Sequence, residues 1–350
     1  MQGKTQKELL AALQRSGLAG PGEEPAVEQL SGGISAEILR VELADMVICA
    51  KRPRGRMQVK ADWLAPVERG GIEVDWLRRA ATVIPGHVPR VLGMDQVSGW
   101  FFLEYLDPGR FDNWKQLLRD GVADPGLAAR VAQLAVTVSA HSSSDPRAAL
   151  DFDNGDSFHA QRIDPYLLES ARRNPDVADR LEKLAHDTAS TRLALLHGDL
   201  SPKNILVDSR PPAGSEAVAL PLLLDAETAC WGDPAFDLAF CLNHLALKCA
   251  WQPQHSKGYL ACWDAFVDSY LAGVSWEDPE LTNARAAALL PALMLARIDG
   301  KSPVEYLVGH PRVDEIRKRA LLWLARPASK LTELRHDWQR QCLAWPAART

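Results

Sequence analysis

The residue types best suited to chemistry gather in one short stretch, residues 195–208, which read LLHGDLSPKNILVD. In this stretch Asp199 lies five residues before Asn204. A second carboxylate motif, Asp225-Ala226-Glu227, follows the apolar run LPLLL further along the chain. Carboxylate and amide oxygens are hard donors of the kind that Mg²⁺ prefers in proteins. The pattern therefore points to chemistry on a metal-bound phosphate group.

Two apolar runs are expected to position these side chains. Residues 205–207 and 220–225 predict two adjacent antiparallel strands. In such a pair, the loop before the first strand and the loop after the second meet at the same edge. We therefore expect Asp199, Asn204 and Asp225 to lie together.

Transfer of a phosphoryl group to a hydroxyl needs a set of this kind. One carboxylate accepts or orients the hydroxyl proton, and other oxygen ligands hold Mg²⁺ on the nucleotide phosphates. In kinases an Asp lies five residues before an Asn in the catalytic loop, and a later Asp binds the metal. The spacing predicts an ATP- and Mg²⁺-dependent phosphotransferase.

The motif HGDLSPKN resembles the catalytic loop of the aminoglycoside phosphotransferase and choline kinase-like family. The segment LLLDAETACWGDPAFDLAF resembles the metal motif of that family and the helix after it. The resemblance covers about residues 28–250 and implies a two-lobed protein-kinase-like fold. It also implies that Asp199 is the catalytic base and that Asn204 and Asp225 are Mg²⁺ ligands.

Other polar residues of these motifs have more than one interpretation. The D-x-E form is similar to that of methylthioribose kinases, which makes Glu227 a candidate for a further metal ligand, direct or through water. Lys203 is either a contact for the transferring phosphate and acceptor or a solvated lysine. Asp237 lies in an apolar helix, where its carboxylate needs hydrogen-bond donors. The resemblance implies that these donors are backbone N–H groups of residues 197–199. His197 is interpreted as structural.

The nucleotide side is expected in the first hundred residues. Ser31, Gly32 and Gly33 precede two expected strands and permit close backbone approach to ATP phosphates. Lys51 ends the strand-like run VICAK and matches the lysine that holds the α- and β-phosphates, with Lys60 as its competitor.

Two further nucleotide contacts are assigned by position. Glu73 is the expected helix partner of the strand lysine, and Glu68 is the alternative. The segment WFFLEYLDPG resembles the hinge between lobes, where backbone groups of Glu104 and Leu106 would read the adenine edge.

The periodicity of apolar residues gives an α+β chain. Residues 1–106 are expected to form a β-rich lobe after a short first helix and a linker at 20–25, and residues 107–350 a mainly helical lobe. In the first lobe, strands are predicted around 41–43, at 47–50, 88–92 and 100–103, and a helix at 66–83. In the second, residues 143–160 are expected to be an exposed loop, and helices are predicted at 124–141, 163–189, 233–248, 258–273, 281–298 and 312–324.

Composition excludes several other classes. The net charge of −5 over 350 residues is too mild for a nucleic acid or an anionic membrane as partner. Six cysteines without a C-x-x-C pair predict free thiols, and no run is apolar enough for a signal peptide or a bilayer span. We expect a cytoplasmic protein.

The acceptor is expected to be a small hydroxyl compound such as an aminoglycoside, amino alcohol, sugar or other metabolite. An acidic lining would indicate an amine, and an aromatic box a quaternary amine. Alternatives are a methylthioribose-kinase-like sugar kinase, a catalytically inactive nucleotide-binding regulator and a protein kinase, although no A-P-E segment follows the metal motif.

Overall fold

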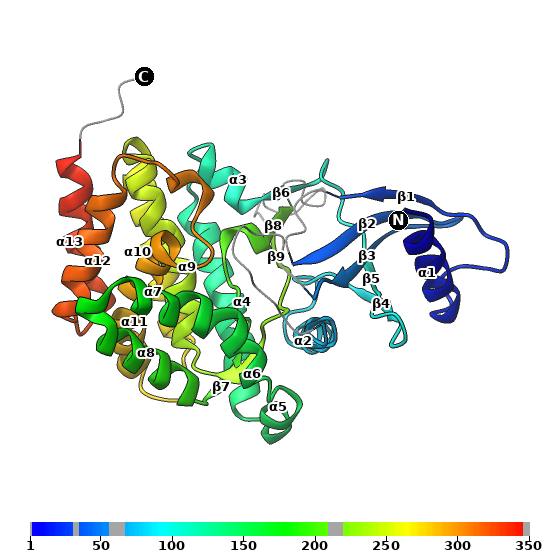
Figure 1. Ribbon diagram of the computed structural model, residues 1–350, viewed down its shortest axis with the longest axis horizontal. Coiled ribbons are helices and arrows are strands. Elements are labelled where there is room, and N and C mark those ends of the chain that lie inside the picture. The colour runs from blue at the N-terminus through cyan, green and yellow to red at the C-terminus, as the bar shows by residue number, and fades with distance from the viewer. Residues whose placement is uncertain (1, 31–34, 56–66, 209–219, 346–350) are drawn as a thin grey trace.

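The computed structural model describes residues 2–30, 35–55, 67–208 and 220–345. It has two parts, a sheet with two helices and a larger mass of helices, with short strands between them (Figure 1). This arrangement confirms the expected two-lobed α+β fold. No helix in these four ranges is long and apolar enough to cross a bilayer.

The N-terminal sheet is antiparallel throughout and has the strand order β1-β2-β3-β5-β4. Its strands are β1 (Ala26–Gln29), β2 (Ala36–Glu42), β3 (Val47–Pro53), β4 (Val91–Met94) and β5 (Phe101–Glu104). Strand β4 begins three residues later than the sequence predicts. Helix α1 (Gln2–Arg15) lies at the outer end of the sheet (Figure 1) and buries Leu9 and Leu13 against Ile48 and Phe102.

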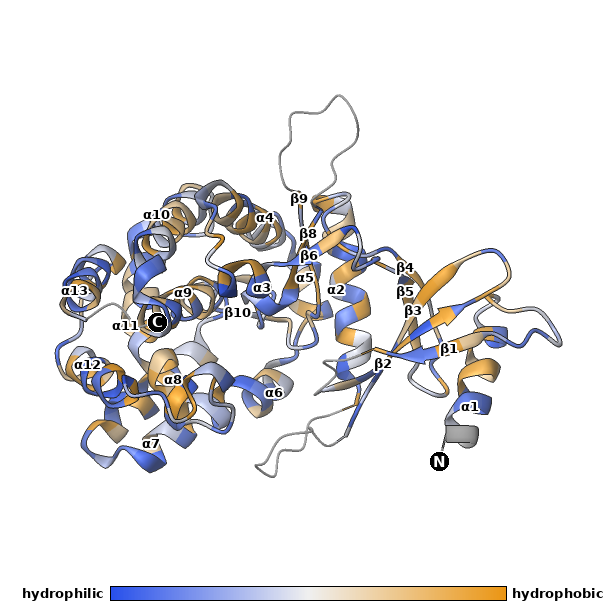
Figure 2. Ribbon diagram, turned by 90° about the horizontal axis from the view of Figure 1, so that it is seen from above, coloured by the Kyte–Doolittle hydropathy of each residue, from blue (hydrophilic) through white to orange (hydrophobic). Residues whose placement is uncertain are grey.

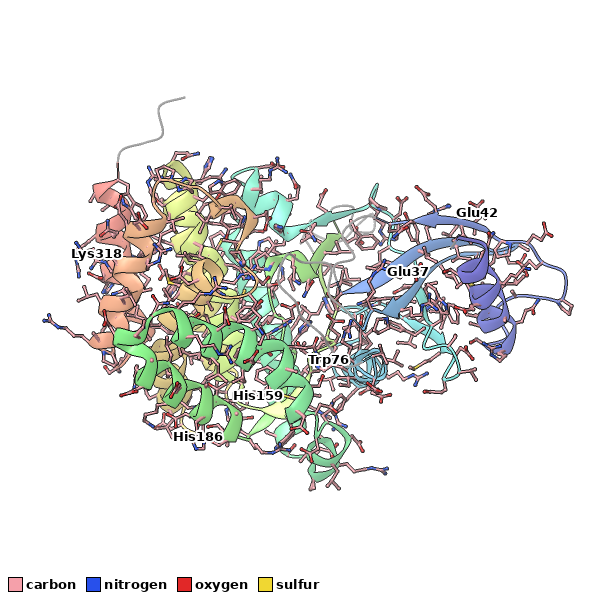
Figure 3. All side chains as sticks on the ribbon, viewed as in Figure 1. Glu37, Glu42, Trp76, His159, His186 and Lys318 are labelled. Atoms are coloured by element: carbon pink, nitrogen blue, oxygen red, sulfur yellow. The ribbon has the colours of Figure 1, made fainter. Side chains whose placement is uncertain are left out.

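The alternation along β3 decides where Lys51 points. Successive side chains of a strand face opposite sides of the sheet. Ile48 and Ala50 join the cluster under α1, so Lys51 faces the other side, where α2 (Arg69–Val83) lies. Helix α2 buries Val74, Trp76 and other apolar side chains. In Figure 3, Trp76 lies where α2 meets the helical lobe.

The helical lobe is built around α9 (Ala235–Trp251), whose residues are all buried up to Ala250 except His244. A helix that is apolar on all faces must be enclosed by others, and Figure 2 shows α9 among the other helices of this lobe. Its main neighbours are α10 (Ser256–Ala272) and α11 (Pro279–Asp299). The remaining longer helices are α4 (Pro125–Ser143), α8 (Ala178–Ser190), α12 (Val313–Ala325) and α13 (Leu331–Ala344).

Short strands and helices link the two parts. Strands β6 (Phe111–Asn113), β8 (Ile205–Asp208) and β9 (Leu220–Leu223) form one small sheet, and β7 (Ala194–Leu196) pairs with β10 (Cys230–Gly232). Helix α3 (Trp114–Arg119) follows β6, and its cap is Asn113, whose side chain accepts a hydrogen bond from the backbone N–H of Lys115. All six cysteines are free, as predicted.

The single helix predicted at 163–189 is wrong. The chain forms a π-helical segment, η1 (His159–Leu168), then α7 (Glu169–Arg173), a 3-10 turn η2 (Pro175–Val177) and α8. Pro175 explains the break because a proline disfavours helical dihedrals in the residue before it. Asn174 accordingly has φ −131° and ψ 75°. Pro165, inside η1, has no N–H to donate to a regular helical ladder.

The exposed loop predicted at 143–160 is also wrong. This stretch contains α5 (Pro146–Asp151) and α6 (Gly155–Phe158), and it buries Phe152 and Phe158. The pair Asp145-Pro146 begins a helix here, because the Asp145 side chain accepts a hydrogen bond from the backbone N–H of Arg147 and proline suits the first helical turn.

Candidate active site

The β8–β9 hairpin brings the two carboxylate motifs to one edge. Its register pairs Ile205 with Leu223. The backbone N–H of Leu224 also donates to the carbonyl of Asn204 at 2.9 Å, just beyond the strands. The loop with Asp199 therefore enters β8 where the loop with Asp225 leaves β9, as the hairpin geometry predicts.

Two unusual backbone conformations shape these loops. Gly198 has φ +76°, and a Cβ there would collide with the backbone oxygen of Thr228. Only glycine fits such a position without strain. Asp225 has φ +63° and is the one non-glycine residue with positive φ among the residues that the structure describes. Such strain persists where surrounding contacts enforce it and is common at functional sites.

Asp199 is buried and surrounded by donors. Its carboxylate accepts hydrogen bonds from the Nδ2 group of Asn204 and from Lys203 Nζ, both at 2.9 Å, and it lies 3.1 Å from Arg162 Nη2. Burial opposes its ionisation, but the charges of Arg162 and Lys203 outweigh burial and hold the pKa of Asp199 at about 2. The side chain is therefore a fixed anion that is suited to orienting a proton donor.

Arg162 was not anticipated from the sequence. It lies in the π-helical segment η1 and is almost fully buried. Its Nε donates to the carbonyl of Gly198 at 2.8 Å, and its guanidinium lies over the rings of Tyr166 and Phe240. A single arginine in the segment AQRIDPY matches no known sequence motif. Pro165 was the one available signal, because it indicates an irregular helix, and π-helical turns are frequent at functional sites.

His197 and Asp237 form the scaffold of the catalytic loop. Asp237 accepts hydrogen bonds from the backbone N–H groups of His197 (2.6 Å) and Gly198 (2.9 Å), which confirms the expected contact for these two residues. The N–H of Asp199 instead donates to His197 Nδ1 at 3.2 Å, so Nε2 carries the proton and donates to the carbonyl of Leu224 at 3.0 Å. Burial lowers the pKa of His197 to about 4, so the ring is neutral at pH 7. The His197 side chain thus joins the two loops.

Lys51 and Glu73, both buried, and the partly buried Asp225 form an ionic group between the lobes. Lys51 Nζ lies 2.6 Å from Glu73 Oε2 and 2.5 Å from Asp225 Oδ1. Burial alone would lower the pKa of Lys51, but the charges of Asp225 and Glu73 raise it. Glu68, the alternative partner, is exposed. The competing Lys60 and the candidates Ser31, Gly32 and Gly33 lie outside the described residues.

Glu227 contacts an arginine rather than the Lys51 group. Its Oε2 accepts a hydrogen bond from Arg69 Nε at 2.8 Å, and both side chains are buried. Arg69 begins α2 and also donates to the carbonyls of Ser35 and Arg54 at the ends of β2 and β3. Arg69, which the sequence analysis did not single out, therefore ties the first sheet and α2 to the loop after β9.

The expected hinge residues lie between the two sheets. Glu104 ends β5, and its backbone N–H donates to the carbonyl of Arg90 at 3.0 Å. Leu106 belongs to the connection between β5 and β6, and its N–H donates to no residue in the described part of the chain. The backbone of Leu106 is thus free to read a ligand edge.

The donors present at this edge fit Mg²⁺. Among the residues described, no group of three or more His, Cys, Asp or Glu side chains could hold an ion. Mg²⁺ needs fewer, because it keeps several waters and binds one or two carboxylates together with substrate phosphates. The side-chain oxygen of Asn204 accepts no hydrogen bond from a described residue, and the Asp225 carboxylate adjoins the same edge. These two hard donors suit an ion that arrives with a nucleotide.

Replacement of Asp237 should unfold the scaffold. Asp237→Ala leaves the N–H groups of His197 and Gly198 without partners, which costs about 1–3 kcal/mol or more for charge-assisted bonds. We expect a lower melting temperature, measured by thermal denaturation, and a smaller loss for Asp237→Asn, which keeps one acceptor. The control is Asp268→Ala, an exposed aspartate on α10. Equal melting temperatures for Asp237→Ala and this control would show that the Asp237 carboxylate does not stabilise the catalytic loop.

Comparison with known proteins places the chain in a family. The model of the phosphotransferase enzyme family matches residues 26–268. A comparison with curated protein sequences gives no match. Among solved structures, a proposed aminoglycoside phosphotransferase from Ralstonia eutropha JMP134 is 13% identical, with 96% of this chain and 98% of that chain covered and a TM-score of 0.50. This likeness supports the fold.

Two other solved structures are similar at lower TM-scores. The ethanolamine kinase of Plasmodium vivax is 12% identical over 90% of this chain and 83% of its own, with a TM-score of 0.46. A glucosamine kinase is 18% identical over 92% of this chain and 84% of its own, also at 0.46. The family match spans well over half of the chain, and the protein therefore belongs to the phosphotransferase enzyme family.

Proposed function

We propose that the protein transfers the γ-phosphoryl group of ATP to a hydroxyl group of a small molecule, with Mg²⁺ as cofactor. One observation carries this proposal. Asp199 and Asp225 lie on neighbouring loops of one hairpin, the first bound to Asn204 and the second to the Lys51–Glu73 pair. A phosphotransferase needs this separation between a carboxylate for the acceptor and a carboxylate for the metal.

The acceptor side consists of Asp199 and its neighbours. Asp199 accepts or orients the proton of the attacking hydroxyl while Arg162 and Asn204 keep its carboxylate in place. Because the pKa of Asp199 is low, the hydroxyl proton moves to this carboxylate late in the reaction, after the attacking oxygen has begun to bond to phosphorus, ADP has begun to leave and the hydroxyl has become more acidic. Lys203 is exposed and contacts Asp199, so its ammonium is suited to the transferring phosphoryl group.

The nucleotide side uses both lobes. Lys51, oriented by Glu73, holds the phosphates, and Ser31, Gly32 and Gly33 cover them. The backbone groups of Glu104 and Leu106 read the adenine edge. Asn204 and Asp225 hold Mg²⁺, which neutralises the charge that develops on the phosphate oxygens. On this proposal residues 1–106 bind the nucleotide, and residues 107–350 supply the catalytic loop, the metal ligands and the acceptor contacts.

Glu227 takes a positioning role in this scheme. Its contact with Arg69 links the metal loop to the first lobe, so the D-x-E motif does not by itself favour a sugar kinase. The short path from Asp225 to the start of α9 at Ala235 leaves no room for a protein-kinase activation segment, which supports a small acceptor. An inactive regulator would not need Lys51, Asp199, Asn204 and Asp225 in one connected set.

The first test separates the two carboxylates. We expect Asp199→Asn to lower turnover by about 10²–10⁴-fold, the usual contribution of a positioned acid or base, while Mg·ATP binding is retained. Asp225→Ala should weaken Mg·ATP binding as well as turnover. Turnover is measured as ADP formation and phosphorylated product across hydroxyl compounds, and binding by nucleotide titration with and without Mg²⁺. Turnover of folded Asp199→Asn within tenfold of the wild type would reject the base assignment.

A second test concerns Arg162. Arg162→Met removes the cation that orients Asp199 but leaves the nucleotide contacts intact. We expect kcat to fall by about 10–100-fold, as for a misplaced catalytic group, with little change in the affinity for Mg·ATP. Arg162→Lys should restore part of the loss. Arg326→Met, at an exposed position after α12, is the control. Equal kcat in Arg162→Met and the control would exclude the positioning role.

A further inference from the structure

A cluster of basic side chains extends from Lys203, which contacts Asp199, into the helical lobe. We define it as Lys115 of α3, Lys203 of the catalytic loop, His244 and Lys248 of α9, and Arg297 of α11. Burial and the charges of the other four together hold the pKa of His244 well below its usual value. The charges of four cations therefore act on one neutral imidazole, which has no hydrogen-bond partner in the part of the chain that is described.

A chain of contacts connects this basic cluster to the catalytic loop. Arg162, paired with Asp199, lies over the rings of Tyr166 and Phe240. The Phe240 ring contacts the ring of His244, with centroids 5.7 Å apart. Arg297 lies 5.7 Å from the Tyr166 ring centroid. Lys51 reaches Asp225 from the first sheet, whereas the contacts of Arg162 lead from Asp199 into the helices. The cluster thus lies on the acceptor side of the site.

Lys248 is a buried cation that makes no direct ion pair with a described residue, although the charge of Glu305 acts on it. Its residue is 2% exposed, and it forms no hydrogen bond or ion pair with a described residue. Its ammonium instead lies 5.2 Å and 5.1 Å from the ring centroids of Trp251 and Tyr306. Burial first, and the charge of Lys115 second, lower the pKa of Lys248 to about 8. An unpaired buried ammonium is costly unless a ligand compensates it.

Arg297 also lacks a carboxylate partner. Its Nη1 donates to the hydroxyl of Tyr166 at 3.2 Å and to the carbonyl of Ser302 at 2.5 Å. Its Nε is buried and has no partner. The nearby carboxylate of Glu305 pairs with Lys115 instead. Part of the guanidinium is therefore left for another acceptor of hydrogen bonds.

The charges in this region do not balance among the described residues. Three cations, Lys115, Lys248 and Arg297, face the single carboxylate Glu305, a difference of two positive charges. The whole chain has a net charge of −5, so this excess is local. Such a region attracts anions and repels amines.

The aromatic pair does not favour a quaternary amine. Trp251 and Tyr306 pack against each other with centroids 4.8 Å apart, so no cation fits between the two rings. The ammonium of Lys248 lies beside the pair and already contacts both rings. A second cation would add repulsion without a new partner.

We propose that the acceptor is a hydroxyl compound with an anionic group, a carboxylate or a phosphate, which Lys248 and Arg297 bind while Asp199 takes the hydroxyl. This inference rests on the proposed phosphotransferase function and names the class of its acceptor. Lys248 supplies a point charge, and Arg297 supplies planar donors that suit two oxygens of one group.

Binding of a simple anion tests the cluster without knowledge of the acceptor. Sulfate is titrated by calorimetry into the wild type with Mg²⁺ and a non-hydrolysable ATP analogue present, which occupies the nucleotide phosphate contacts. We expect the sulfate Kd to rise about 10–100-fold in Lys248→Met, as for a lost charge-assisted bond. Arg297→Gln should behave likewise, and Arg297→Lys, which keeps the charge but not the planar pair of donors, should keep part of the affinity. Lys183→Met, an exposed lysine paired with Asp187 on α8, is the control.

The sulfate result can overturn the proposal in either of two ways. Sulfate that fails to bind the wild type, or that binds Lys248→Met and Arg297→Gln as tightly as the control, rules out the anion site. Sulfate bound equally by every variant is an adventitious ion only, and it counts against the proposal. If Lys248→Met does not fold, the sulfate Kd values of Arg297→Gln and Arg297→Lys decide the question. Equal values for these two variants would reject the anion site.

Acceptor triads then test the class of acceptor directly. Each triad shares a hydroxylated scaffold and differs in charge: glycerate, glycerol and 3-amino-1,2-propanediol; gluconate, glucose and glucosamine. Glucose 6-phosphate distinguishes phosphate from carboxylate. We expect the anionic member to give the highest kcat/KM and its KM to rise in Lys248→Met, with the KM for ATP unchanged. A preference for the amine or neutral member rejects the proposal, while a failure to bind Mg·ATP at all rejects the phosphotransferase function instead.

Discussion

The mutual repulsion of two neighbouring carboxylates, the buried Asp199 and the partly buried Asp225, is the constraint that the surrounding structure has to offset. Burial acts to raise the pKa of Asp225, and the charge of Asp199 acts in the same direction. Each carboxylate nevertheless stays ionised because it has its own cations. Lys51 comes to Asp225 from the first sheet, and Arg162 comes to Asp199 from the helical lobe. The site therefore exists only where both parts of the molecule meet.

The scaffold fixes these groups through backbone contacts. Asp237 holds the turn at His197 and Gly198, and the neutral His197 ring joins that turn to Leu224. Arg69 and Glu227 make a second connection between the lobes, independent of Lys51. A change at these positions alters the geometry of the site without touching the substrate. The same arrangement leaves uncompensated positive charge at Lys248 and Arg297, where an anionic acceptor would complete the balance.

The sequence predicted the parts of this structure that depend on local order. The hairpin of β8 and β9, the facing of Lys51 towards α2 and the contact of Asp237 follow from alternation, spacing and a recognised motif. Arg162, Arg69 and Lys248 could not be found this way. The main partner of Arg69 is Glu227, 158 residues away, and Lys248 contacts Tyr306 of a different segment. Arg162 lies in a helix whose irregularity is indicated only by a proline. The helix break at Asn174 depends on Pro175, and the helix cap at Asp145 depends on Pro146. Both prolines are visible in the sequence, but the prediction gave more weight to the periodicity of apolar residues.

Metal specificity after a ligand change tests the division of roles between the two carboxylates most directly. A cysteine thiolate is a soft ligand that favours Cd²⁺ over Mg²⁺. If Asp225 holds the metal and Asp199 holds the acceptor, ADP formation by Asp225→Cys is lost with Mg²⁺ and returns when Cd²⁺ replaces it, whereas Asp199→Cys stays inactive with both ions. An equal response of the two variants to Cd²⁺, or full activity of Asp225→Cys with Mg²⁺, would contradict this assignment.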